Sequence, residues 1–96
     1  MKIRVKGYFN LKNGMDGKAV IEVEKETATI RDILDYIADR FGKDLTELLF
    51  DPDTEELAGH VILLVNGLNH LYMPKMLDTE LKDGDEIALF PPLAGG

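Results

Sequence analysis

The sequence predicts a two-layer α+β domain in which one main helix packs on a mixed sheet of four to five strands. Two observations support this: apolar and polar residues alternate in two segments within residues 3–24, and in the segment after them the apolar period becomes that of a helix. The 96 residues suffice for one hydrophobic core but are too few for two domains. With 45% apolar and 30% charged residues, the composition is that of a folded domain.

The first strand is expected to begin at Ile3, where apolar residues alternate with polar ones as far as Leu11. A glycine-rich run at residues 13–17 is turn chemistry, and alternation resumes at residues 19–24. These two segments are therefore predicted to form a hairpin. The glycines and lysine of residues 14–18 lack the spacing of a phosphate-binding loop, so the turn interpretation is preferred.

The central helix is predicted for residues 30–41, whose apolar residues lie on one helical face. Thr29 is a suitable N-cap, Asp32 complements the helix dipole and Gly42 is a suitable stop. A short second helix is suggested by the leucines of residues 45–49. The apolar run at 61–65 predicts a strand that is covered on both faces or interior to the sheet, and residues 86–90 predict the last strand. The order hairpin, helix, strand, loop, strand is the β-grasp arrangement.

The chain after the last strand differs in character, so we divide it into a domain at residues 1–90 and an extended tail at residues 91–96. Pro91 and Pro92 cannot continue a sheet ladder, and Gly95 and Gly96 have no side chains. Six extended residues reach on the order of 20 Å. The tail could therefore place a terminal carboxylate deep inside another protein.

A carboxylate must be activated before it can react, and attack on the α-phosphate of ATP would give an acyl-adenylate. The chain has no phosphate-binding loop or evident metal site, so ATP and Mg²⁺ are expected on a partner enzyme and no cofactor on this chain. The net charge of -7 disfavours nucleic acid. The absence of cysteine excludes disulfides and thiolate chemistry. Without an apolar signal or membrane-spanning segment, a cytoplasmic protein is expected.

Residues 81–96, LKDGDEIALFPPLAGG, resemble the end of the small, sulfur-carrying subunit of molybdopterin synthase. The first strand and the helix start at Thr29 also resemble that ubiquitin-like family and its thiamine-pathway relatives. The resemblance implies that Gly96 is adenylated by an E1-like activating enzyme, related to those of ubiquitin, and converted to a thiocarboxylate that donates sulfur. It also implies insertion of the tail into the large subunit of the synthase, where sulfur passes to a pterin precursor.

The resemblance further assigns roles along the tail. Phe90, Pro91 and Pro92 would orient the arm and contact the partner, while Leu93, Ala94 and Gly95 would pass through a narrow tunnel to present Gly96. Residues 43–59 and 68–76 are less typical of the family, and residues 77–80 replace its usual short polar turn with a bulkier segment, which leaves the choice of partner open. On this interpretation the chain is a carrier and a substrate of its activating enzyme, not an enzyme.

Three functions remain in competition: a sulfur carrier for molybdopterin or tRNA thiolation, a modifier joined to protein lysines, and a β-grasp interaction domain with an inert tail. Phe90 could equally be a core residue of the last strand. His60 and His70 have no nucleophile spaced to pair with them and receive no role. A calcium loop beginning at Asp51 fails, because Glu56 and Ile62 stand at its sixth and twelfth positions.

Overall fold

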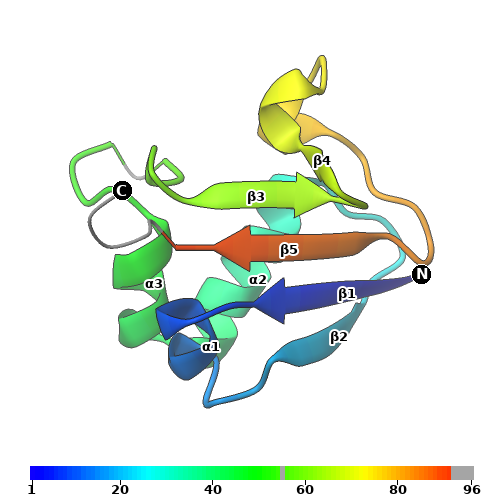
Figure 1. Cartoon of the computed structure of the whole chain (residues 1–96). Helices are drawn as coiled ribbons and strands as arrows, with labels where there is room; N and C mark the ends of the chain where they lie inside the picture. The colour runs from blue at the N-terminus through cyan, green and yellow to red at the C-terminus, as the bar shows by residue number, and fades with distance from the viewer. Residues whose placement is uncertain (55, 92–96) are drawn as a thin grey trace.

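The computed structural model describes residues 1–54 and 56–91 and has two layers, a five-stranded sheet and a layer of helices (Figure 1). The strands lie in the order β2-β1-β5-β3-β4. Their bounds are Lys2–Gly7 (β1), Val20–Glu24 (β2), Ile62–Val65 (β3), Leu68–Asn69 (β4) and Glu86–Phe90 (β5). The predicted mixed sheet on one main helix is confirmed.

The middle of the sheet is formed by segments far apart in the sequence. β5 lies parallel to β1, with Val5 opposite Ile87, and antiparallel to β3, with Leu63 opposite Leu89. All four of these side chains are buried against the helices. β3 is therefore an interior strand of the sheet, which was one of the two predicted alternatives. The other alternative, a strand covered on both faces, is wrong, since Ile62 on the outer face is 46% exposed.

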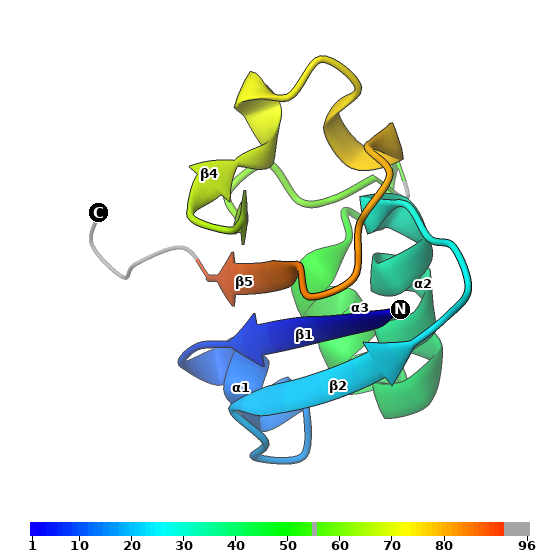
Figure 2. The same cartoon turned by 90° about the vertical axis from the view of Figure 1, so that its right-hand side faces the viewer.

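The main helix, α2 (Ile30–Phe41), covers the inner face of the sheet (Figure 2). Its buried residues are those of the predicted apolar stripe, among them Ile33 and Ile37. The predicted caps are also confirmed. The Thr29 hydroxyl accepts the Asp32 N–H at 3.2 Å, the Asp32 carboxylate accepts the Thr29 N–H at 2.9 Å, and Gly42 ends the helix with φ +79°. This reciprocal pair is a capping box.

The prediction for residues 8–17 is wrong in part. β1 ends at Gly7, and a short helix, α1 (Asn10–Gly14), stands where the strand and the tight hairpin turn were expected. Leu11 is buried, as its apolar position suggested, but it reaches the core from a helix, whereas Phe9 is 65% exposed. Gly7 permits this path, since a Cβ there would lie 2.6 Å from Met15 Sδ. The antiparallel pairing of β1 with β2 is as predicted.

The remaining segments complete the helical layer and one edge of the sheet. The predicted short second helix is α3 (Lys43–Leu49), which packs Leu45 and Leu49 into the core. β4 and two 3₁₀ turns, η1 (His70–Tyr72) and η2 (Met76–Asp78), occupy the stretch whose sequence gave no regular pattern. The isolated bridge between Thr29 and Glu80 ties the end of this stretch to the start of α2.

Candidate docking site at the end of the last strand

β5 brings Phe90 to the outer face of the sheet. Its side chains alternate, so Ile87 and Leu89 are fully buried on the helix side while Ala88 and Phe90 are partly exposed on the other. Phe90 is therefore not a core residue of the last strand, and its contact with a partner stays a prediction. Pro91, the next residue, is buried. The tail therefore departs from a point fixed at the middle of the sheet.

Phe90 is held by an aromatic stack. Its ring lies 4.3 Å from that of Tyr8, with an angle of 9° between the ring planes. The backbone supports the stack, because the Tyr8 N–H donates to the Leu89 carbonyl oxygen at 3.2 Å just beyond the end of β1. Stacked aromatic pairs contribute about 0.5–1.5 kcal/mol beyond simple burial. Phe90 is thus a preformed platform at the foot of the tail.

The stack belongs to a wider apolar surface. In the sheet register Ile62 stands opposite Phe90, and Leu64 stands opposite Ala88. Directly opposed residues of antiparallel strands share one face, so these side chains lie together on the outer surface. We call this surface, formed by residues of two strands, β3 and β5, and by the residue after β1, the docking face: Tyr8, Ile62, Leu64, Ala88 and Phe90.

Charges border the docking face on its β1 side. Lys6 stands beside Ala88 in the parallel register, and both Lys6 and Arg4 pair with Glu86, at 3.2 Å and 3.0 Å. These pairs are partly exposed to solvent, and ion pairs at a protein surface contribute little to stability. An apolar centre with a charged rim is the usual anatomy of a protein–protein interface.

Only part of the predicted site lies within the described residues. Phe90 and Pro91 are placed as above, whereas Pro92, Leu93, Ala94, Gly95 and Gly96 lie outside them. The sequence reasoning missed Tyr8, Ile62 and Leu64. A signal for Tyr8 was present, because it occupies a solvent-side position in the alternation of the first strand despite its large ring.

Residues 1–54 and 56–91 contain neither a metal-binding cluster nor a membrane-spanning helix. No three His, Asp or Glu side chains there gather closely enough to hold a metal ion. None of the helices in this part of the chain has the length and apolar character needed to cross a membrane.

Comparison with known proteins identifies a family whose sequence pattern includes the tail. A family model described as the ThiS family matches residues 8–96. A protein of Archaeoglobus fulgidus that bears the name of a sulfur carrier is 33% identical over 76 residues, which are 79% of this chain and 83% of that protein.

Solved structures show the same fold. The crystal structure of SAMP1 from Haloferax volcanii, a small archaeal modifier protein, superposes with a TM-score of 0.84 at 30% identity and covers 100% of both chains. A protein of Pyrococcus furiosus named for subunit 1 of molybdopterin converting factor has a TM-score of 0.72 at 31% identity, covering 97% of this chain and 99% of that one. The predicted β-grasp fold is confirmed. The similar proteins are carriers and modifiers, which confirms the prediction of a carrier that is not itself an enzyme.

Proposed function

The chain belongs to the ThiS family of ubiquitin-like sulfur carriers, and we propose that it carries sulfur as a thiocarboxylate on Gly96. The observation that carries this proposal is the family match through residue 96, which includes the tail that follows the partly exposed, stacked ring of Phe90. The pathway we propose is the synthesis of molybdopterin, on the likeness to the converting-factor subunit.

The proposed chemistry uses one atom group of this chain. A Gly96 carboxylate oxygen attacks the α-phosphorus of ATP and pyrophosphate leaves, which gives an acyl-adenylate. A sulfur donor then displaces AMP at the carbonyl carbon and leaves a thiocarboxylate. ATP and Mg²⁺ belong to an E1-like activating enzyme, and this chain supplies the acyl group. Glycine suits the end position because a narrow active-site passage has no room for Cβ atoms.

The activating enzyme binds the carrier at the docking face. Its aromatic and aliphatic side chains can be covered by a partner, which would direct the tail from Pro91 into the partner's active site. Aromatic residues at the centre of such surfaces commonly carry much of the binding energy. We propose the same face for the large subunit of molybdopterin synthase, which would make the two partners compete for one carrier.

Intact mass spectrometry tests the carrier proposal. The full chain is incubated with a candidate activating enzyme, ATP and a sulfide donor. A gain of about 16 Da, from one oxygen replaced by sulfur and located on the peptide containing Gly96, is expected. A chain lacking Gly96 should gain no mass, while the matched variant His60→Asn, altered at an exposed residue outside the docking face, should react like the original chain. Neither adenylate nor thiocarboxylate on the original chain, with an enzyme shown to activate a related carrier, would refute the proposal.

Conjugation to lysines is a second candidate function, favoured by the likeness to the archaeal modifier proteins. It would use the same acyl-adenylate, with a lysine amine as the attacking group in place of the sulfur donor. Trypsin cleaves this chain for the last time after Lys82, so the expected evidence is tryptic peptides, recovered from cells that express the chain, in which a lysine carries the segment of residues 83–96. Cells expressing the chain without Gly96 should yield none, and equal recovery from both strains would contradict this function.

A further inference from the structure

A small cavity lies away from the docking face, at the edge of the sheet beyond β3. It has a volume of about 300 Å³, at the lower end of the range for small-molecule sites and enough for one aromatic ring system. η1 and η2, the loop before β3 and the first turn of α2 surround it. Its walls are mainly apolar side chains: Leu57, Ala58, Val61, Leu71 and Leu77.

His70 also lines this cavity, together with four charged residues, Arg31, Glu56, Lys75 and Asp78. His70 is only 6% exposed, and its Nδ1 lies 3.3 Å from the Leu63 carbonyl oxygen. A carbonyl oxygen can only accept, so Nδ1 carries the proton, and Nε2 of the neutral ring is left with a lone pair. Within the described residues Nε2 has no hydrogen bond, although every fully buried side-chain nitrogen or oxygen there has a partner. Nε2 therefore reaches solvent, and the space that His70 borders is the cavity.

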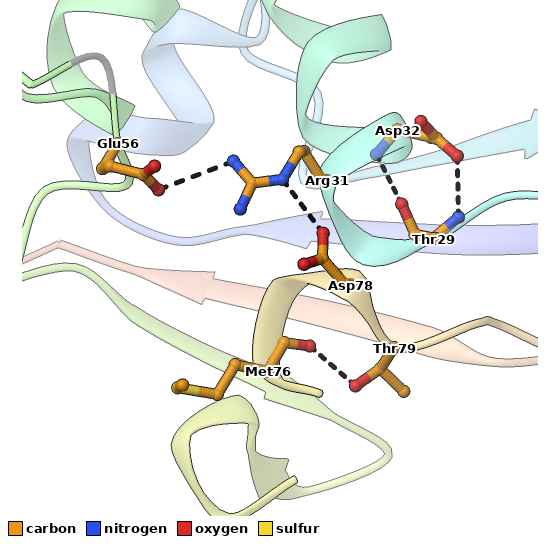
Figure 3. Close-up of polar contacts among 7 residues, drawn as sticks. All are labelled: Thr29, Arg31, Asp32, Glu56, Met76, Asp78 and Thr79. Carbon is orange, nitrogen blue, oxygen red and sulfur yellow. Dashed lines mark hydrogen bonds and ion pairs between the residues drawn. The ribbon is translucent and has the colours of Figure 1, made fainter. Parts of the chain in front are cut away.

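Ion pairs connect the segments on either side of the cavity opening. Arg31, on α2, donates to Asp78 at 3.2 Å and lies 3.5 Å from Glu56, so it joins the two loops that flank the opening (Figure 3). The hydrogen bond to Asp78 raises the pKa of the Arg31 guanidinium, which stays charged wherever the protein is folded. Met76, half exposed at the rim, is fixed at φ 45° by the Thr79 hydroxyl and N–H, which donate to its carbonyl oxygen at 2.7 Å and 3.1 Å. The opening is thus held in shape without a ligand.

We propose that this cavity receives an aromatic side chain of a partner protein that carries a ring N–H or O–H, a tryptophan or tyrosine. The apolar walls suit the ring, the lone pair of His70 Nε2 accepts the N–H or O–H, and the Met76 thioether suits an aromatic edge. Leu71, which is part of the cavity wall, and the neighbouring Tyr72 are 64% and 80% exposed, and the same partner would cover both side chains. Trp and Tyr are the residues most often found as anchors in such pockets.

This surface is separate from the docking face and does not depend on the chemistry of the tail. None of the described residues that line the cavity belongs to the docking face, and those that do line it include Arg31 of α2 and the buried Leu77. A partner held here would leave the outer face of the sheet free. The carrier could then bind its activating enzyme and a second protein at the same time.

Indole is the probe for the test, with benzofuran, which has the same shape but a ring oxygen in place of the N–H, as the matched control. Each is titrated into the ¹⁵N-labelled full chain and followed by the amide resonances of residues 57–78. We expect indole to move the Leu71, Met76 and Leu77 resonances with a dissociation constant on the order of 1 mM. Benzofuran should bind about tenfold more weakly, since its oxygen would face the Nε2 lone pair.

Two variants locate the acceptor. His70→Asn keeps a donor for the Leu63 carbonyl but removes the Nε2 lone pair, and should reduce the preference for indole over benzofuran from about tenfold to less than twofold. His60→Asn, at an exposed histidine, should leave it unchanged. If His70→Asn does not fold, the two probes on the original chain decide alone. Equal affinity for both probes, shifts elsewhere on the surface, or no shift at about 5 mM indole would each overturn the proposal.

Discussion

Replacing Phe90 with alanine should weaken the fold as well as the docking of partners, and the stability part follows from the structure. A buried Phe→Ala change costs about 3–5 kcal/mol, and Phe90 is partly exposed, so we expect roughly 2–3 kcal/mol, which includes the loss of its stack on Tyr8 at 4.3 Å. For a domain of this size that corresponds to a fall in melting temperature of roughly 10–20 °C.

Urea denaturation of four proteins measures the stack itself: the original chain, Tyr8→Ala, Phe90→Ala and the double variant. The coupling free energy of the two changes should be about 0.5–1.5 kcal/mol in favour of the pair. Phe9→Ala is the control, because Phe9 neighbours Tyr8 but is 65% exposed and outside the stack, so its cost should stay within about 0.5 kcal/mol. A coupling free energy indistinguishable from zero would show that the rings do not stack in solution and that Phe90 is no fixed platform.

The other predictions concern local features of the fold and are checked by urea or thermal denaturation. Gly42→Ala should cost about 1–2 kcal/mol because φ there is +79°, while Gly59→Ala, with open space around its Cβ and no such φ, should be neutral; equal costs would contradict this reasoning. Thr29→Ala should cost about 1 kcal/mol through loss of the N-cap, and Thr29→Ser should restore most of it. Arg31→Ala should cost less than about 1 kcal/mol and nothing at about 1 M salt. Because the pKa of Arg31 is raised in the folded state, its contribution is complete below the unfolded pKa, and the cost should be constant between about pH 5 and about pH 9.

The parts of the fold that could be predicted are those whose signals are local. α2 combines a helical apolar stripe with a capping residue at one end and a glycine at the other, and all three signals fall within 14 residues of sequence, Thr29 to Gly42. The path after β1 could not be predicted the same way. Leu11 fits an alternating strand as well as a buried helical position, and the choice depends on Met15 packing over Gly7. That contact is visible only in three dimensions.

The same limit explains why the tail was found from the sequence and the docking face was not. A run of prolines and glycines is recognisable by composition, whereas Tyr8, Ile62 and Phe90 are isolated apolar residues on three segments more than 25 residues apart. They meet only because β5 is inserted between β1 and β3. Once that order is known, large apolar side chains at solvent-side positions of adjacent strands are unusual for a sheet face exposed to water, and they predict a partner. The docking face is thus readable from the sequence only together with the strand order.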